Sequence, residues 1–213
     1  TKDRIDKAAA TSLNEAVDRM AGVDSQDYCV NCGAKRISIN GLRGDHTSVL
    51  IDGIPLYSSV TSVYGYDTIS MQSVSEIEVQ RGTGSALINP EAIGGAINIL
   101  TITPEKKENR ASVLIGSHKT QNYELLHTNV FDTYKIAVGA EYSLQETWDV
   151  DRNNFAESPF KSRYSVFLKQ FLNLSDSTEW TTRLNFAAMD IIGGNTVYHR
   201  LKGPIDIQAS DTD

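Results

Sequence analysis

The feature that most constrains this fold is an alternation of side-chain character, with a period of two, in the second half of the chain. Residues 134–145 place large or apolar side chains at every even position and small or polar ones at every odd position. Residues 180–189 repeat the pattern, and residues 163–169 show it more weakly. Only an extended strand presents alternate side chains to opposite faces. This half is therefore predicted to form β-strands with one largely apolar face.

The connections between these strands carry further information. Additional strands are expected at 111–117 and 122–131, which brings the total to about five. Short turns at 132–133 and 175–178 alternate with a long polar loop at 148–160. Strands of about ten residues with alternately short and long connections are typical of outer-membrane barrels. A soluble β-sandwich or meander also alternates, so the strand pattern alone leaves both architectures open.

Charge and hydropathy narrow the classes of function. The formal net charge is -7, and this acidic balance argues against a nucleic-acid partner. No apolar run approaches the ~18 residues that a membrane-spanning helix requires. Alternating strands dilute the apolar signal, so the composition stays compatible with a membrane β-barrel.

The first hundred residues mix helix and strand signals. Ser12 and Glu15 form a capping box, which predicts a helix that ends at Gly22. A shorter helix is expected over 2–10. Strands are expected at 36–40, 48–52, 75–80 and 95–101. The turn signals that bound them include Asn40-Gly41, Asp52-Gly53 and Arg81-Gly82. The charged segment 106–110 follows Pro104 as a linker, so residues 1–104 are predicted to form an α+β domain.

Two cysteines, Cys29 and Cys32, are the only ones in the chain. A zinc site needs about four ligands, and no second pair supplies them. A redox dithiol would lie at a helix N-terminus, whereas this pair precedes a strand. The spacing favours a local disulfide in an oxidising compartment.

Catalytic motifs do not emerge from the sequence. Gly82-Thr83-Gly84 lacks the spacing of a dinucleotide loop, and the four histidines are scattered without metal-ligand spacing. No nucleophile elbow is present. We therefore predict that the chain is not an enzyme.

Four ordered blocks carry a family resemblance. They are INGLRG at 39–44, VLIDGIP at 49–55, SEIEVQRGTGSAL at 75–87 and EAIGGAINI at 91–99. Together they resemble the plug domain of TonB-dependent outer-membrane receptors. The later strands are similar to the first barrel strands of the cobalamin and siderophore receptors in this family. No TonB box is recognisable.

The resemblance implies an α+β plug domain over 1–104, followed over 105–213 by the N-terminal antiparallel strands of a transmembrane β-barrel. Barrels of this family have about 22 strands around a plugged lumen, and about five are expected here. We therefore expect the chain to be the N-terminal portion of a longer transporter.

The resemblance also implies site residues in the plug. Charged residues on one strand, Glu76, Glu78 and Arg81, are expected to pair with barrel-wall charges such as Arg183 or Glu141. Ordinary exposed strand positions are the alternative for all three. The apical loops are expected to meet the substrate through Arg43, Asp45, His46, Tyr57, Ser58, Tyr64, Ile88 and Asn89. Two alternatives stay open: Tyr57 and Tyr64 could instead pack against the barrel wall, and His46 could be an exposed loop residue.

The loop at 149–160 starts like a calcium loop. Position six is Asn154 rather than Gly and position twelve is Phe160 rather than Glu, which excludes an EF-hand. An irregular calcium site could use Asp149, Asp151, Asn153 and Glu157. A solvated acidic loop is the alternative.

The function that the resemblance implies is import of a scarce nutrient across the bacterial outer membrane. Candidate substrates are a ferric siderophore, haem, cobalamin or another metal chelate. The implied partners are the TonB-ExbB-ExbD complex, outer-membrane lipid and the chelate. A surface lipoprotein is a further candidate partner. No cofactor is expected besides the calcium candidate. A signal-transducing receptor and a soluble periplasmic or extracellular α+β plus β-sandwich binding module are the alternatives.

Overall fold

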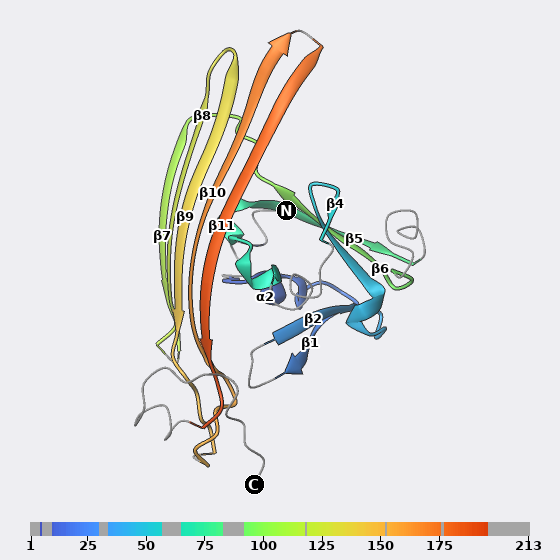
Figure 1. The fold of residues 1–213 in the computed structure, drawn as a ribbon, viewed down its shortest axis with the longest axis vertical. Coiled ribbons are helices and arrows are strands. Elements are labelled where there is room, and N and C mark those ends of the chain that lie inside the picture. The colour runs from blue at the N-terminus through green and yellow to red at the C-terminus, as the bar shows by residue number, and fades with distance from the viewer. Residues whose placement is uncertain are drawn as a thin grey trace.

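A computed structural model of the chain describes residues 5, 10–29, 34–56, 65–82, 92–117, 119–151, 153–175 and 177–195. Within them, strands β1 and β2 pair, four strands form a sheet in the order β4-β3-β6-β5, and five form a sheet in the order β11-β10-β9-β8-β7. Figure 1 shows the five-stranded sheet as a tall curved layer, with the earlier elements on its concave side. We call β7–β11 the wall and the elements before it the plug.

The plug contains short helical segments and two sheets. Strands β3 and β6 run parallel, whereas β5 and β4 pair antiparallel with their neighbours. Its elements are α2 (Leu13–Val17), β1 (Val23–Cys29), β2 (Ala34–Ile39), η1 (Gly44–His46), β3 (Thr47–Ile51), β4 (Ile54–Pro55), η2 (Gly65–Thr68), η3 (Met71–Ser73), β5 (Val74–Arg81) and β6 (Gly95–Thr101).

The wall is a continuous antiparallel meander. Each strand pairs with the next in the chain over eight or more residues. Its strands are β7 (Glu108–Ile115), β8 (Gln121–Val130), β9 (Tyr134–Gln145), β10 (Phe160–Ser175) and β11 (Thr178–Ile192). The five predicted strands are therefore confirmed, with β10 and β11 longer than expected. The described strands form one sheet rather than two facing sheets, so the β-sandwich alternative does not fit them.

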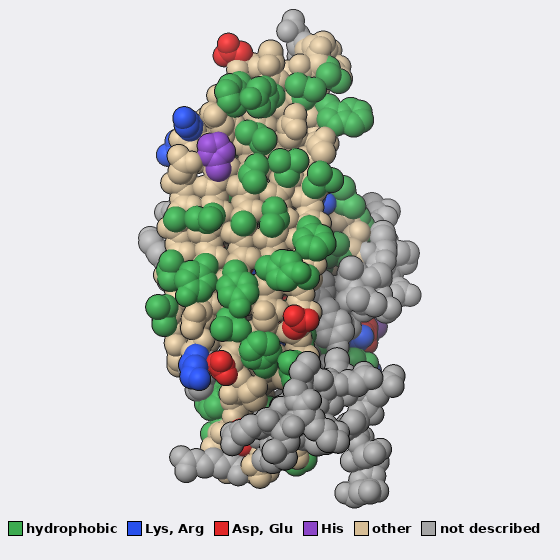
Figure 2. Space-filling model, turned by 60° about the vertical axis from the view of Figure 1, so that its left-hand side comes forward, with side chains coloured by type: hydrophobic (Ala, Val, Ile, Leu, Met, Phe, Trp, Pro, Cys, Tyr) green, Lys and Arg blue, Asp and Glu red, His purple; other side chains and the backbone are tan. Residues whose placement is uncertain are grey.

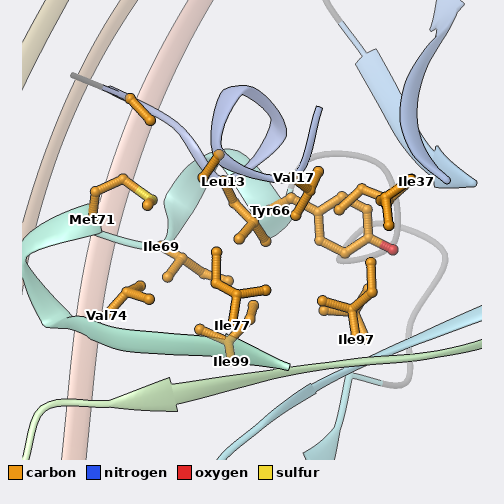
Figure 3. Packing of buried hydrophobic residues seen from close by; sticks show 14 of the residues in the cluster. Leu13, Val17, Ile37, Tyr66, Ile69, Met71, Val74, Ile77, Ile97 and Ile99 are labelled. Atoms are coloured by element: carbon orange, nitrogen blue, oxygen red, sulfur yellow. The ribbon is translucent and has the colours of Figure 1, made fainter. Parts of the chain in front are cut away.

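The hydrophobic core lies inside the plug. Leu13 and Val17 of α2 pack over Ile77, Ile97 and Ile99 of the four-stranded sheet (Figure 3). All five are less than 9% exposed. Because α2 presents one apolar face and the sheet presents another, the two layers bury each other. The predicted α+β character of the plug is thereby confirmed.

Tyr66 and Ile69 close this core from the segment around η2 (Figure 3). Burial raises the pKa of the Tyr66 hydroxyl to about 12, against a smaller opposing effect of Arg36. The ring therefore stays neutral and acts as a packing element of the core.

Two glycine-containing turns take the form that their sequences predict. Asp52 and Gly53 both have positive φ, at 49° and 80°, in the two-residue turn that joins β3 to β4. Asn40 and Gly41 show the same pairing of positive φ values. Two-residue loops with positive φ at both positions are those that Asp-Gly and Asn-Gly favour.

The helical prediction for the plug was partly wrong. Ser12 is the N-cap and its hydroxyl accepts from the Glu15 backbone N–H at 3.3 Å. Glu15 Oε2 accepts from the Thr11 N–H at 2.7 Å rather than from Ser12. Helix α2 ends at Val17, not at Gly22, because the chain must turn there into the unpredicted strand β1. The short helix expected over 2–10 lies largely outside the described residues.

The two faces of the wall differ in chemistry, as the alternation predicts. The inner face, toward the plug, carries Lys135, Glu141, Lys161, Arg163, Lys169 and Arg183, among others. On the outer face, Asp190 is the only residue with a formal charge among the described strand positions. Figure 2 shows this outer face covered by rows of hydrophobic side chains. No helix among the described residues is long and apolar enough to cross a membrane.

Candidate functional site

The plug meets the inner face of the wall through three groups of polar residues. Each joins plug residues to strand residues more than 35 positions away in sequence. Most of the side chains involved are buried or half-buried, so hydrogen bonds within the interface replace much of their contact with water. This interface is the candidate functional site.

The first group is centred on Asp52, in the turn between β3 and β4. Its carboxylate accepts from the Thr101 N–H at 2.7 Å and from the Thr101 hydroxyl at 2.6 Å, which ties the turn to the end of β6. From the wall, Lys169 Nζ lies 3.2 Å and Arg183 Nη1 2.9 Å from Asp52 Oδ2. Lys169 also donates to Thr101 Oγ1 at 2.7 Å. One plug carboxylate thus holds two wall cations.

The surroundings favour the charged form of Asp52. Burial alone would raise its pKa, but the two hydrogen bonds from Thr101 and the positive charge of Lys169 outweigh burial and hold the pKa below the ordinary 3.8. Asp52 is therefore an anion at neutral pH. Its negative charge attracts Lys169 and Arg183 and so helps to hold the plug against the wall.

A cavity of about 180 Å³ adjoins this group, between the plug and the wall. Ile51, Ile69 and Phe167 form apolar parts of its lining, and Lys169 and Arg183 form charged parts. Because the lining has polar groups, the cavity can hold ordered water. Water beside an ion pair lowers the cost of separating the two charges.

The second group is centred on Arg163 of β10, which is 5% exposed. Its guanidinium donates to Glu141 on the neighbouring strand and to the Asp67 backbone oxygen in the plug. It also donates to the Thr11 backbone oxygen at 3.1 Å. The Asp67 carboxylate in turn accepts from Asn14 Nδ2 at 2.8 Å and lies 3.4 Å from Lys161 Nζ. Arg163 therefore joins two plug segments to two wall strands.

The third group is uncharged on the plug side. Gln72 Nε2 donates to Glu124 Oε2 at 2.7 Å and to Ser112 Oγ at 3.3 Å. Ser112 donates to Glu124 at 2.6 Å, and Asn122 donates to its other carboxylate oxygen at 2.9 Å. The Glu124 carboxylate thus accepts hydrogen bonds from neutral donors only. This contact fixes the position of the plug on the wall by hydrogen-bond geometry, without an ion pair.

Two of the plug residues predicted to pair with the wall, Glu78 and Arg81, make contacts within the plug. Glu78 accepts from Asn98 Nδ2 at 3.0 Å, and Arg81 donates to the Ala21 backbone oxygen. Both contacts lie within the plug, and both side chains are exposed. Glu76 is half-buried on the same strand. Strand β5 is the edge of the plug sheet, so Glu78 and Arg81 bond to neighbouring plug segments. Arg183 and Glu141 do take part in the plug–wall interface. Arg183 pairs with Asp52, and Glu141 pairs with Arg163.

Three of the predicted substrate-binding residues fall in the described part of the plug. Arg43, Asp45 and His46 lie together at η1. Asp45 pairs with Arg36 and lies 3.3 Å from Arg43, whose side chain is 79% exposed. Arg36 also stacks 4.0 Å above the ring of Tyr28. The other predicted contacts, Tyr57, Ser58, Tyr64, Ile88 and Asn89, lie outside the described residues.

The acidic loop brings its carboxylates together. Oxygens of Asp149, Asp151 and Glu157 lie within 4.8 Å of one another. Backbone N–H groups already donate to each: Asn154 to Asp149 at 3.0 Å, Asn153 to Asp151 at 3.1 Å and Val150 to Glu157 at 2.6 Å. The Asn153 side-chain oxygen is likewise engaged, by the Phe155 N–H at 2.7 Å. The loop is thus ordered by its own amides, and calcium binding stays a prediction.

Cys29, at the end of β1, is disulfide-bonded. Its only possible partner in the chain is Cys32, which lies outside the described residues.

Sequence reasoning missed Asp52, Asp67 and Lys169 as interface residues. Asp52 was interpreted only as a turn residue. Lys161, Arg163 and Lys169 follow the period of two, which could have assigned all three to the inner face. Their plug partners are distant in sequence and carry no local signal.

Comparison with known proteins identifies this arrangement. The family model of the TonB-dependent receptor plug domain matches residues 1–96. The siderophore receptor PirA from Acinetobacter baumannii is 20% identical, with a TM-score of 0.71 over 90% of this chain and 31% of that one. The ferric enterobactin receptor PfeA from Pseudomonas aeruginosa is 18% identical, with a TM-score of 0.73 over 94% and 35%. The ferric-catecholate import receptor Fiu from E. coli is 20% identical, with a TM-score of 0.68 over 88% and 26%.

Residues 1–96 are therefore a TonB-dependent receptor plug domain, and β7–β11 have the fold of the wall strands that follow it. PirA, PfeA and Fiu are siderophore receptors by name, and the chain spans 26–35% of their length. The matching family model describes a domain of TonB-dependent receptors. It agrees with the predicted location and with the prediction that the chain is not an enzyme.

Proposed function

We propose that this chain is the plug and first wall segment of a TonB-dependent transporter that imports a scarce metal chelate across the outer membrane. A ferric siderophore is the first candidate substrate, because PirA, PfeA and Fiu are siderophore receptors. Haem, cobalamin and other chelates are further candidates. The proposal assigns residues 1–104 to the plug and 105–213 to the barrel.

The observation that carries this proposal is how the plug is seated. Asp52, Arg163 and Gln72 connect it to the wall by polar contacts, while its apolar core lies within the plug itself. A plug held in this way can move relative to the wall without exposing its core. Energy supplied through the TonB-ExbB-ExbD complex would separate the polar contacts, and water could replace the lost partners.

The outer face of the wall supports a membrane location. Tyr142 and Tyr134 lie on this face eight residues apart on β9, which corresponds to about 26 Å along the strand. At the strand tilt of about 40° usual for such barrels, this is about 20 Å along the membrane normal. Outer-membrane barrels carry an apolar band about 25 Å tall between two aromatic girdles. Aromatic pairs mark both ends: Tyr123 with Tyr142, and Phe131 with Tyr134.

The test is uptake by cells that lack their own siderophore, haem and cobalamin receptors and express the full-length protein containing this chain. Radiolabelled ferric siderophore should accumulate, and deletion of TonB should abolish the uptake. Accumulation of labelled haem or cobalamin instead would assign the substrate to that class. Absence of TonB-dependent uptake for all three would contradict the proposal.

A further inference from the structure

Two carboxylates of the wall lie directly opposite each other on its inner face. Glu124 of β8 is the cross-strand partner of Glu141 of β9, and Ser165 of β10 is the partner of Glu141 on its other side. We call these three residues the inner row. Cβ atoms of such partners are about 5 Å apart, so like charges at these positions repel each other. Glu141 is only 3% exposed, so little water reaches it to screen this repulsion.

The described cations around the inner row compensate only one of its two carboxylates. Arg163 pairs with Glu141, whereas Glu124 accepts hydrogen bonds from neutral donors. Two further inner-face cations, on β7 and β10, have carboxylates of their own, in the pairs Arg110–Glu108 and Lys161–Asp67. Among the described residues, the inner row with Arg163 therefore carries one net negative charge.

The group around Asp52 does not supply the missing positive charge. It holds two cations, Lys169 and Arg183, against one carboxylate. Lys169 is four residues beyond Ser165 on β10, which corresponds to about 13 Å along the strand. At that separation neither cation can touch the Glu141 carboxylate, so the charge of the inner row needs a partner nearby.

Buried oxygens around the inner row also lack hydrogen-bond partners among the described residues. They include Glu141 Oε2, Ser165 Oγ, Ser70 Oγ and Gln72 Oε1. Each of these four residues is at most 3% exposed. The Ser70 hydroxyl of the plug faces the Glu141 carboxylate, and Gln72 reaches Glu124 with its amide nitrogen at 2.7 Å. Oxygens buried in this way are costly unless something binds them.

The ligand that fits these oxygens is a hard metal cation. Carboxylate, hydroxyl and amide oxygens are the kind of ligand that hard cations such as Ca²⁺ take. A water molecule can satisfy the hydroxyls by hydrogen bonding, but it leaves the negative charge of the inner row uncompensated. The sign of that charge is wrong for an anion, and the burial of the four residues leaves no room for a bulky organic cation.

We propose that a hard metal cation of sodium or calcium size binds between Glu141 and Ser165 of the wall and Ser70 and Gln72 of the plug. The cation joins the plug segment 70–72 to β9 and β10 and so adds an ionic link to the contacts that dock the plug. This inference goes beyond the import of a chelate, because it concerns a resident ion. It depends only on the described interface and is the same for every candidate substrate.

The test is the rate at which a protease cleaves the plug of the full-length protein in detergent, after removal of metals with EDTA. Urea is kept at a fixed concentration below unfolding, and ionic strength is equal throughout. A cation that binds only the docked plug lowers the population of the open form by the factor 1 + [L]/Kd. Cleavage in NaCl or CaCl₂ should thus be about tenfold slower than in choline chloride once the metal is at about ten times its Kd. Slowing by NaCl alone identifies sodium, and slowing by low millimolar CaCl₂ identifies calcium.

Ser165→Ala is the informative variant, because the two possible outcomes differ in kind. If a cation is bound, the substitution removes a ligand, and the metal concentration for half of the slowing should rise about tenfold or more. If none is bound, it removes only an unpartnered buried hydroxyl and leaves the salt response unchanged. Thr47→Val is the matched control, since it removes a buried, unpartnered hydroxyl from the plug sheet and should keep the full metal effect. Asp151→Asn should keep it too, which separates this site from the acidic loop.

Glu141→Gln provides a second variant, which removes the charge of the principal ligand and should abolish the metal effect. Equal cleavage rates of the parent protein in all three salts would overturn the proposal. The same metal effect in the parent, Ser165→Ala and Glu141→Gln would overturn it as well, because the cation would then act elsewhere. Cleavage is measured without substrate, so these results are independent of whether the uptake experiment succeeds.

Discussion

Lys169 Nζ of the wall lies 3.2 Å from Asp52 Oδ2 of the plug, although the two residues are 117 positions apart in sequence. The Lys169 side chain is only 8% exposed. A lysine so buried is stable as a cation only while a carboxylate or several hydrogen-bond acceptors remain beside it. Whether this ion pair is formed therefore shows whether the plug is docked against the wall.

Replacement of that carboxylate should loosen the plug. In Asp52→Asn, Lys169 and Arg183 lose their anionic partner, and we expect the plug to be destabilised by about 2–3 kcal/mol. The measurement is the urea dependence of protease cleavage within residues 1–104 of the full-length protein in detergent. Asp45→Asn is the control, because Asp45 also pairs with arginines but is 43% exposed and lies away from the wall. It should cost less than about 1 kcal/mol.

The same pair predicts a pH dependence. Hydrogen bonds from Thr101 and the charge of Lys169 hold the pKa of Asp52 below 3.8 against the opposing effect of burial. A carboxyl whose pKa is lower in the folded state stabilises that state fully above its unfolded pKa, and the stabilisation is lost as the pH falls through the folded pKa. The difference in protease resistance between the parent and Asp52→Asn should thus be constant from pH 7 to about 5 and shrink below about 4. A difference unchanged down to pH 3 would contradict this assignment.

The buried pair of Arg163 and Glu141 predicts strong non-additivity. Arg163→Met alone leaves the Glu141 carboxylate, which is 3% exposed, without its cation, and we expect a loss of about 3–5 kcal/mol. Glu141→Met in the same chain removes the stranded charge, so the double variant should be more stable than Arg163→Met. Urea unfolding of the four proteins measures the coupling, and additive losses would show that the two side chains do not act as a pair.

The sequence predicts the strands of the four-stranded plug sheet and of the five-stranded wall better than it predicts the contact between these two sheets. The alternation in 134–145 assigns Lys135 and Glu141 to one face, because side-chain direction in a strand is a local property. The partner of each inner-face charge depends on how the plug docks, which no short-range pattern encodes. Asp52 illustrates the difference: its turn was predicted from Asp-Gly, whereas its two wall cations were not. Strand β1 was missed because Val23–Cys29 lacks alternating apolar residues.

Gly139 lies on the inner face of β9, where a larger side chain is predicted to disturb packing. A second substitution in the neighbouring strand is predicted to relieve that disturbance. A Cβ at this position would lie 2.2 Å from Cε1 of Phe167, the residue opposite on β10. Gly139→Ala should therefore cost about 1–3 kcal/mol by overpacking. The ring of Phe167 is 4% exposed and fills the space above the glycine. Phe167→Leu combined with Gly139→Ala should recover part of that loss in thermal unfolding of the full-length protein, and a double variant less stable than Gly139→Ala would contradict this packing.

The opposite chemistry of the two wall faces predicts a contrast between two positions of β11 whose side chains point to opposite faces. Phe186 lies on the outer face and is 62% exposed, so Phe186→Lys would place an ammonium group in the hydrocarbon of the membrane. We expect a cost of about 1–3 kcal/mol, because Phe186 is level with Ala140, two residues from Tyr142, and the cost falls from the bilayer midplane toward the interface. Thr181 has the inward parity of the same strand, and Thr181→Lys should be tolerated because that side chain faces the polar lumen. Folding yield into phosphatidylcholine vesicles, read from heat-modifiable migration in gels, measures both. Equal yields for the two lysine variants would show that the outer face of β11 does not contact lipid, since only there does the charge lose its hydration.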